Sequence, residues 1–273
     1  MPDSPYRIYE TRFDREVHAR DLQPSSAKAW NDGDPHENSK LLPPDSGAAL
    51  AEGLGEFDGE AIVLVDMSGS TRSSIPGVVS LVDGVALALE AKGAPFQVLG
   101  YTTTSWKGGE SRKQWIEDGR PPHPGRLCDL LHVVFKTRDE SWAETRDAFR
   151  EAIRHGNLKE NIDGEAIRWA LSRLDRRDGA RIVHVGDGSS VDDATLSVNP
   201  KDYLTDDYER AIAEADAKGV TTTLVEANAY PPKHPEGFFR PQRYVFLDYV
   251  PEGPSMAEAA IAAAFADAPA PTP

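Results

Sequence analysis

The stretch AIVLVDMSGS, residues 61–70, indicates the fold class. Its first five residues are apolar and largely β-branched, which predicts a short strand buried on both faces, as the strands of parallel sheets are. Apolar residues then recur at helical spacing from Ile75 to Leu89, with Pro76 in the first turn and Gly93 as a stop. A buried strand, a polar turn and a helix in this order indicate one half of a βαβ unit.

The same alternation of strand and helix continues along the chain. Further strands are predicted at residues 96–101, 181–185, 220–225 and 244–247. Helices are predicted after Ser141, around residues 167–174 and 208–218, and after Ser255. Strands separated by helices imply parallel pairing with right-handed crossovers. We therefore predict an α/β fold with a doubly wound, mostly parallel sheet flanked by helices, whose ligands bind beyond the carboxyl ends of the strands.

Changes in composition divide the chain into an arm, one domain and a tail. Residues 1–57 are rich in Pro, Gly, Asp and Ser, which predicts a mostly irregular N-terminal arm with a short helix near residues 13–22. Residues 58–267 form the predicted α/β domain, and its insertion at residues 104–140 is long for a connection in a compact domain. Residues 268–273 predict a disordered tail.

The composition disfavours several classes of function. Acidic residues outnumber basic ones by 45 to 30, and the net charge of −15 disfavours nucleic acid and favours cations or basic protein surfaces as partners. The single cysteine, Cys128, cannot form an internal disulfide, and the first residues lack the apolar segment of a secretory signal. No stretch approaches the roughly 18 apolar residues of a membrane helix. We therefore expect a cytoplasmic protein with no membrane partner.

Oxygen-bearing side chains follow two of the predicted strands. Asp66, Ser68 and Ser70 occupy alternate positions after the first strand, and Asp187 follows the strand at residues 181–185. If the two strands are neighbours, these side chains converge at the carboxyl edge of the sheet, and such hard oxygen ligands suit Mg²⁺ or Mn²⁺ but not zinc. The alternative for the first three residues is N-capping of the next helix, and for Asp187 it is a plain turn.

These residues resemble the metal-ion-dependent adhesion site of von Willebrand factor A domains. The resemblance implies that a Thr from a middle loop completes the site, but the matching residues 161–167 contain no Thr. In the register of the family pattern Asn161 stands at the Thr position and Asp163 follows two residues later, so either could supply the oxygen. The alternative for Asp163 is an N-cap of the next helix. Such a site leaves Mg²⁺ short of ligands, so an acidic side chain of a partner can complete it.

Longer stretches are similar to the CobT family of aerobic cobaltochelatase subunits. The similar residues are 101–112, 124–132, 158–166 and 191–200, in the order of the family and with about its spacing. A shorter match at residues 6–14 resembles a segment that lies well upstream of the A domain in CobT, where a long helical stretch separates the two. Here only residues 15–59 separate them, and Met67 replaces the Asn that is usual inside the metal motif.

The resemblance implies a function in cobalamin biosynthesis. A CobT-like subunit is a non-catalytic coupling component that works with a CobS-like AAA+ ATPase and a large CobN-like subunit in ATP-dependent insertion of cobalt into a corrin precursor. The sequence contains no Gly-x-x-x-x-Gly-Lys-Ser/Thr motif, so we expect no intrinsic ATPase activity. The alternative is a stand-alone adaptor of another, MoxR-type AAA+ ATPase, unrelated to cobalamin. A hydrolase is disfavoured because no Ser-His-Asp arrangement has a convincing context.

The insertion carries aromatic and basic residues of the kind found at partner interfaces. They predict a docking surface, unless the tryptophans pack on the core, and are Trp106, Lys107, Arg112, Trp115 and Arg126. Asp192 and Asp193 follow the second metal motif either as a solvated loop, which we favour, or as side chains that orient the metal ligands. The spacing of His123, Cys128 and His132 matches no common metal site, so we expect no cobalt there.

Overall fold

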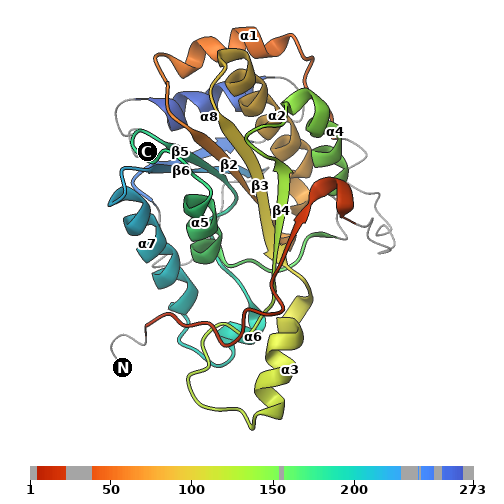
Figure 1. Ribbon diagram of the computed structural model, residues 1–273, viewed down its shortest axis with the longest axis vertical. Helices are drawn as coiled ribbons and strands as arrows, with labels where there is room; N and C mark the ends of the chain where they lie inside the picture. Colours follow the sequence, from red (N-terminus) through yellow and green to blue (C-terminus); the bar gives the residue numbers. More distant parts are fainter. Residues whose placement is uncertain are drawn as a thin grey trace.

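A computed structural model describes residues 5–22, 39–153, 157–228, 239, 241–248 and 254–266 of the chain. In this part of the chain seven strands form one sheet in the order β1-β4-β3-β2-β5-β6-β7 (Figure 1). The strands are β1 (Arg15–His18), β2 (Ala61–Asp66), β3 (Phe96–Thr103), β4 (Leu130–Lys136), β5 (Arg181–Val185), β6 (Thr221–Asn228) and β7 (Tyr244–Asp248). All neighbours are parallel except β3 and β4, which are antiparallel. The predicted α/β fold with a mostly parallel sheet is confirmed.

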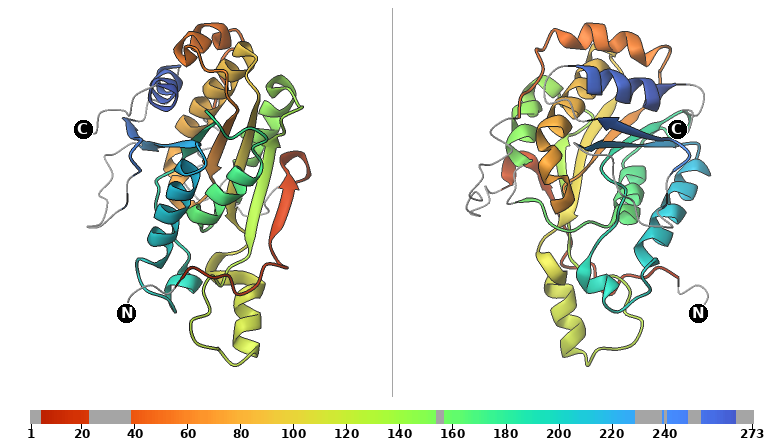
Figure 2. Two further views of the ribbon diagram at one scale, coloured as in Figure 1. Left: turned by 60° about the vertical axis from the view of Figure 1, so that its left-hand side comes forward. Right: turned by 180° about the vertical axis from the view of Figure 1, so that it is seen from behind.

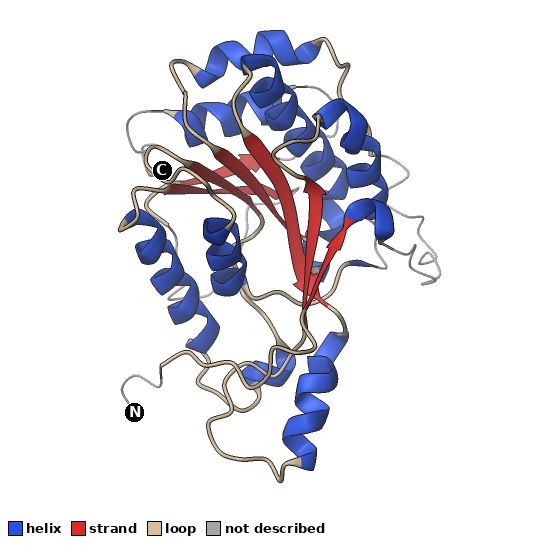
Figure 3. Ribbon diagram, viewed as in Figure 1, coloured by secondary structure: helices blue, strands red, loops and turns tan. Residues whose placement is uncertain are grey.

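Helices cover both faces of the sheet (Figure 3). They are α1 (Ser46–Ala51), α2 (Ile75–Lys92), α3 (Gly109–Glu117), α4 (Trp142–Ala152), α5 (Asp163–Ser172), α6 (Asp193–Leu196), α7 (Tyr203–Asp216) and α8 (Ser255–Phe265). Val63 and Val65 of β2 belong to a core shared with α2, α4 and α8. Ile62 and Leu64 belong to a second core shared with α5 and α7. Alternate residues of β2 therefore face opposite layers, which explains why the whole strand is apolar.

Helix α2 is the central helix of the first core. Pro76 lies in its first turn, and Gly93 ends it with a φ of 72°, a left-handed conformation that glycine adopts without strain. The segment Gly69–Lys92 is long and apolar enough to cross a membrane, with a mean hydropathy of 1.5, but 89% of its most apolar window is buried inside the protein. The segment is therefore explained by its place in the core.

The N-terminal arm is more ordered than the sequence predicts. The expected helix near residues 13–22 is wrong for most of its length, because Arg15–His18 form β1 and only Ala19–Asp21 form a short 3-10 helix. Strand β1 pairs in parallel with β4, from Arg15 beside Leu131 to His18 beside Val134. Its backbone groups are satisfied by a strand far along the chain, which local propensity cannot reveal.

The segment 104–140 is only in part an insertion. Its later residues Leu130–Lys136 form β4 and belong to the sheet. Its earlier residues form a 3-10 turn at Trp106–Gly108 and helix α3, which projects away from the sheet (Figure 2). The projecting part therefore ends before β4. The predicted tail at residues 268–273 lies outside the described residues.

The pairing of β2 with β5 determines which residues meet at the carboxyl edge of the sheet. Leu64 pairs with His184 and Val65 with Val185, so the next residues, Asp66 and Gly186, lie side by side. The two strands that carry the predicted metal motifs are thus neighbours. Their ends lie at the edge where ligands bind in folds of this type.

Candidate metal centre

The side chains of the Asp-x-Ser-x-Ser loop are hydrogen-bonded to one another at the end of β2. One carboxylate oxygen of Asp66 accepts from the backbone N–H of Ser68 at 2.7 Å, and the other accepts from the Ser68 hydroxyl at 3.0 Å. The hydroxyl oxygens of Ser68 and Ser70 are 2.9 Å apart. Ser68 precedes the following 3-10 turn without making a side-chain capping bond. The loop therefore links its oxygen atoms to each other and does not use Ser68 as an N-cap.

Asp187 joins this group from the end of β5. A Cβ on Gly186 would lie 2.7 Å from the Cβ of Asp66, so a glycine is needed where the two strand ends approach. Asp187 accepts from the backbone N–H of Ser189 at 2.9 Å, and the nearby Ser70 hydroxyl lowers the pKa of the same carboxyl group. The acids at the two strand ends thus both lie near hydroxyls of the loop.

Of the two candidates for the missing Thr, Asp163 keeps an unused oxygen. The amide of Asn161 donates to Asp163 at 2.9 Å and to the Ser189 carbonyl at 3.0 Å, and its oxygen accepts from the Val191 N–H at 3.2 Å. One oxygen of Asp163 also accepts from the Tyr101 hydroxyl at 2.5 Å. Its other oxygen is buried, and among the described residues no group bonds to it. No side-chain cap precedes α5, so the N-cap alternative for Asp163 is not observed.

Burial controls the ionisation of these acids. It raises the pKa of Asp66 well above the usual range, and the charges of Asp187 and Asp163 raise it further. The pKa values of Asp163 and Asp187 are also raised, in both cases mainly by burial. Three neighbouring carboxyl groups, two of them buried and one half-buried, resist full ionisation unless a cation neutralises them.

The donor set fits a hard divalent cation. Carboxylate and hydroxyl oxygens are the ligands that Mg²⁺ and Mn²⁺ prefer, and the unused oxygen of Asp163 is a buried acceptor that such an ion would satisfy. Within the ranges that the structure describes, no group of three or more His, Cys, Asp or Glu side chains is arranged to hold a metal by itself. An ion here would therefore depend on the serine hydroxyls, and on water or an oxygen of a partner, as well as on the acids.

An open pocket of about 420 Å³ connects this group of oxygens to solvent; we call it the metal pocket. It is lined by residues of several loops, among them Ser68, Ser70, Trp106, Asn161, Asp187 and Val191. Asp66, Ser68 and Asp163 are buried, whereas Ser70 is exposed and Asp187 is half-buried. A partner could therefore reach the site from the side of Ser70 and Asp187.

A buried chain of hydrogen bonds lies next to the metal pocket, and we did not predict it from the sequence. The hydroxyl of Tyr101, at the end of β3, donates to Asp163 and lies 2.6 Å from Nε2 of His184 in β5. Nδ1 of His184 is 2.9 Å from the hydroxyl of Tyr208 in α7. Burial lowers the pKa of His184 to about 4, so its ring is neutral at pH 7. The only signal in the sequence was a histidine inside the otherwise apolar end of a strand.

The predicted docking residues differ in accessibility. Trp106 is 54% exposed, and Lys107 and Arg112 are also exposed. Trp115 is half-buried, and its indole N–H donates to the Pro121 carbonyl at 3.0 Å. These four therefore remain available, in whole or in part, to a partner.

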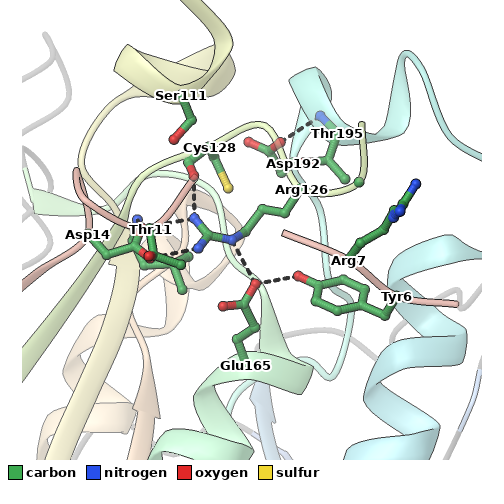
Figure 4. A network of polar contacts seen from close by, with 12 residues as sticks. Tyr6, Arg7, Thr11, Asp14, Ser111, Arg126, Cys128, Glu165, Asp192 and Thr195 are labelled. Carbon is green, nitrogen blue, oxygen red and sulfur yellow. Dashed lines mark hydrogen bonds and ion pairs between the residues drawn. The ribbon is translucent and has the colours of Figure 1, made fainter. Parts of the chain in front are cut away.

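Arg126 is fully buried, so its assignment to a partner surface is wrong. It instead ties the N-terminal segment to the domain (Figure 4). Its guanidinium makes a two-point ion pair with Asp14 at 2.6 and 2.9 Å and pairs with Glu165 of α5 at 2.7 Å. It also donates to the carbonyl of Cys128, and Tyr6 donates to the same Glu165. A buried guanidinium requires partners of this kind, so the role of Arg126 is structural.

The acids after the second metal motif have different environments. Asp192 is buried and accepts from a backbone N–H at 2.7 Å as the N-cap of α6, so the solvated loop is the wrong interpretation for Asp192. Asp193 is exposed, as a solvated loop requires. Cys128 is buried, and the ring of His132 stacks on Trp169 with the centroids 4.1 Å apart.

A larger hollow, of about 880 Å³, lies between the N-terminal segment and helices α5 and α7. Its charged side chains already pair with one another: Arg168 bonds to Asp207 at 2.8 Å and to Glu214 at 2.9 Å. Volume alone would favour this hollow as the functional site. Ser68 and Asn161 line the metal pocket and bond to the buried Asp66 and Asp163, so we place the candidate site there.

A mostly parallel sheet with helices on both faces, and with oxygen-bearing loops at its carboxyl edge, is the arrangement of von Willebrand A-type domains. A family model described as the VWA domain of the cobalamin biosynthesis protein CobT matches residues 57–225, more than half of the chain. The chain belongs to this family of CobT VWA domains.

Among solved structures, the chain is similar to proximal thread matrix protein 1 from the mussel byssus. The match covers 75% of this chain and 46% of that chain, at 13% sequence identity and with a TM-score of 0.39. This chain thus spans less than half of the length of that protein. A likeness at this level carries no argument about function.

Proposed function

We propose that this chain is a cation-dependent, non-catalytic binding subunit of a cobaltochelatase. Its membership of the CobT VWA family supports a role in cobalamin biosynthesis. In this proposal its partners are a CobS-like AAA+ ATPase and a large CobN-like subunit, and it couples ATP hydrolysis to the insertion of cobalt into a corrin precursor. The assembly works in the cytoplasm.

The observation that carries the proposal is the set of acidic and hydroxyl oxygens at the carboxyl edge of the sheet. Asp66 bonds to Ser68, whose hydroxyl contacts Ser70, and Ser70 lies near Asp187. One oxygen of the buried Asp163 bonds to no group in the described residues. A bound Mg²⁺ or Mn²⁺ ion would supply positive charge and a coordination position for a carboxylate of a partner.

The residues of this chain have separate roles in the proposal. Asp66 and Asp187 hold the ion, and two hydrogen bonds from Ser68 orient the Asp66 carboxylate. Tyr101 binds one oxygen of Asp163, which leaves the other oxygen for the ion. Ser70 and Asp187 are the accessible members of the group, so the partner approaches from their side.

The variant Asp66→Asn tests the proposal, because asparagine keeps the shape of aspartate and removes its charge. We expect Asp66→Asn to weaken Mn²⁺ binding by at least about tenfold, measured by electron paramagnetic resonance of the free ion. It should also abolish Mg²⁺-dependent co-purification with the ATPase subunit, and cobalt insertion in a chelatase reconstituted from the three subunits.

The matched control is Asp147→Asn, which removes an exposed negative charge on α4, outside the metal pocket. This control should behave like the wild type in all three assays. The proposal is wrong if Asp66→Asn and the wild type bind Mn²⁺ equally. It is also wrong if chelation proceeds unchanged when the chain is left out.

A second candidate is a stand-alone adaptor of another, MoxR-type AAA+ ATPase. It is favoured by the position of the N-terminal segment, which packs directly on the domain through Asp14 and Arg126. The segment similar to it in CobT is separated from the A domain by a long helical stretch, so a shortened protein could have changed its partner. Mg²⁺-dependent binding of an ATPase with no link to corrin chemistry would decide for this candidate.

A further inference from the structure

Exposed apolar side chains gather at the metal pocket. In the described part of the chain the exposed large apolar residues are Ile8, Trp106, Ile116 and Val191. Trp106 is 54% exposed and Val191 is 42% exposed, and both line the metal pocket. Two of the four therefore lie beside the candidate ion, on loops that come from different parts of the chain.

The structure holds Trp106 in this exposed position. Its indole ring lies against Gly69 of the metal-binding loop, where an added Cβ would be 2.7 Å from the ring. The next residue, Lys107, has a φ of 62°, a left-handed conformation that is strained in a residue other than glycine. Such strain persists only where the surrounding contacts fix it.

Glu160 supplies those contacts and connects the two apolar residues. One of its carboxylate oxygens accepts from the Lys107 N–H at 2.6 Å, and the other accepts from the Asp193 N–H at 2.9 Å. Asp193 lies two residues after Val191, so the same side chain fixes the loops of both Trp106 and Val191. The two apolar residues thus border the pocket as parts of one connected arrangement.

We infer that the metal pocket binds one carboxylate side chain of a partner protein together with a large apolar side chain next to it in the partner's sequence, the apolar side chain lying against Trp106 and Val191. This inference rests on the proposed function, which supplies the cation for the carboxylate. An apolar side chain would remove the exposed faces of both residues from water, which a small hydrophilic anion cannot do.

The charge of the chain limits the partner further. The net charge is −15, and the pocket wall carries both acids and bases: Glu160, Asp187 and Asp193 against Arg72 and Lys159. The acidic chain as a whole disfavours a run of acidic residues, and the exposed Trp106 and Val191 favour uncharged, apolar neighbours for the single carboxylate. The partner is therefore a protein segment with one Asp or Glu flanked by Leu, Ile, Met or Phe.

Peptide binding to the full chain tests the inference. The probes are three hexapeptides: Gly-Ser-Leu-Asp-Leu-Gly, the same peptide with Ser in place of both Leu residues, and the same peptide with Asn in place of Asp. We follow the indole N–H signals in ¹⁵N-labelled protein with Mg²⁺ or with EDTA. The Leu-Asp-Leu peptide should bind about tenfold more tightly than the Ser form and shift the Trp106 signal. The Asn form, and all peptides in EDTA, should not bind.

Two variants assign the effect to the apolar residues. Trp106→Ala and Val191→Ser should each reduce the preference for Leu over Ser to about twofold or less, with unchanged Mn²⁺ affinity. The control is Ile116→Ser, which changes an exposed apolar residue on α3, outside the metal pocket, and should leave the preference intact.

The outcomes separate the inference from the proposed function. If the Leu and Ser peptides bind the protein equally in Mg²⁺, the inference is wrong and the cation site stands. The same holds if the protein binds Mn²⁺ but neither peptide. If the wild type fails to bind Mn²⁺, the proposed function fails as well. Binding of the Asn peptide as tightly as the Asp peptide would show that the pocket recognises the apolar residue without the carboxylate, which also overturns the inference.

Discussion

Asp66 lies buried at the end of β2, where it accepts two hydrogen bonds from Ser68. Its pKa is raised first by burial and then by the charges of Asp187 and Asp163. A carboxyl group with a raised pKa stabilises the folded state below its unfolded value, near 3.8, and this contribution is lost as the pH rises through the raised value. At neutral pH and without a divalent cation, Asp66 therefore opposes folding.

We expect Asp66→Asn to be more stable than the wild type in EDTA at pH 7.5, by roughly 1 kcal/mol or more, because the amide removes the buried charge. In Mg²⁺ this advantage should shrink or reverse, since only the wild type gains stability from the ion. Urea unfolding in the two buffers measures both free energies. A variant that is less stable than the wild type in EDTA and responds equally to Mg²⁺ would contradict this explanation.

Glu160 acts on the loops of the metal pocket through two backbone N–H groups, those of Lys107 and Asp193. We expect Glu160→Ala to speed amide hydrogen exchange at both residues by about tenfold or more, because each N–H loses its acceptor. Glu160→Gln keeps one acceptor oxygen and should affect only one of them. The Ser111 N–H, bound by Asp129 at 2.8 Å, serves as the internal control. Unchanged exchange at Lys107 and Asp193 would mean that other contacts hold these loops.

The N-terminal segment, the start of β4 and helix α5 meet at the side chain of Arg126. The guanidinium is buried and pairs with Asp14 and Glu165. We expect Arg126→Met to lower the free energy of unfolding by about 3 kcal/mol, because two half-buried acids lose the buried charge that pairs with them. Arg12→Met is the control, since Arg12 is exposed and its ion pair with Glu10 is a surface pair, which contributes little to stability. Urea denaturation compares the two, and equal small losses would show that the network contributes little.

His132 gives β4 a dependence on pH that is separate from the metal pocket. Its ring stacks on Trp169, and burial lowers its pKa to about 4. A histidine with a lowered folded pKa contributes stability above its unfolded value of 6.5, and this contribution is lost as the pH falls toward 4. Acid should therefore weaken the folded state through His132.

The variant His132→Phe keeps a ring to stack on Trp169 and cannot be protonated. Its stability relative to the wild type should be about 1–2 kcal/mol higher at pH 5 than at pH 7.5, because only the wild type must keep a neutral histidine in acid. Urea unfolding at the two pH values measures the difference. His123→Gln, at an exposed histidine, should show no such change. Parallel pH dependences of His132→Phe and the wild type would mean that His132 titrates normally in the folded protein.

The sequence predicted those strands and helices whose buried side chains form a recognisable apolar pattern within the element itself. Strands β2 and β5 are covered on both faces, so each needs an apolar run that can be recognised without its neighbours. Strand β1 has the sequence REVH and exposed or half-buried side chains, and it is a strand only because β4 lies beside it. Strand β4 was hidden inside an apparent insertion, since its pairing with β3 is antiparallel and breaks the expected alternation.

The residues of the candidate site likewise fall into those that local spacing predicts and those that depend on contacts distant in sequence. The spacing of the Asp-x-Ser-x-Ser loop predicted residues that the β2–β5 register brings together. The choice between Asn161 and Asp163 could not be made, because it depends on Tyr101 and on the Val191 N–H, which come from other elements. Because the side chain of Arg126 is charged, we predicted that it lies on the surface. Only its acidic partners, which are distant in sequence, explain its burial.

At the scale of the whole molecule, the net charge and the position of the metal pocket act together. A chain with a charge of −15 attracts divalent cations over long distances and repels other acidic proteins. A bound cation therefore gives a partner's carboxylate a local attraction on an otherwise unfavourable surface. A negative net charge together with a cation in the metal pocket therefore favours partner binding that depends strictly on the ion.

The N-terminal segment closes one edge of the whole sheet. Strand β1 lies beside β4 at the end of the strand order, as Figure 1 shows. Without it, β4 would become an edge strand with unpaired backbone groups, which readily pair with another chain. The same segment supplies Asp14 to Arg126 and stacks Tyr6 on Tyr203, with ring centroids 5.3 Å apart.

We expect removal of residues 1–22 to lower stability at least as much as Arg126→Met, and to cause association that increases with protein concentration, because the edge of β4 and the buried guanidinium both lose their partners. Removal of residues 1–4 alone is the matched control, since it spares every contact described for this segment. Sedimentation velocity and urea unfolding measure the two effects. The folded fraction should still bind Mn²⁺ like the wild type, because the metal pocket lies at β2 and β5. A shortened chain that is monomeric and as stable as the control would show that the sheet does not need β1.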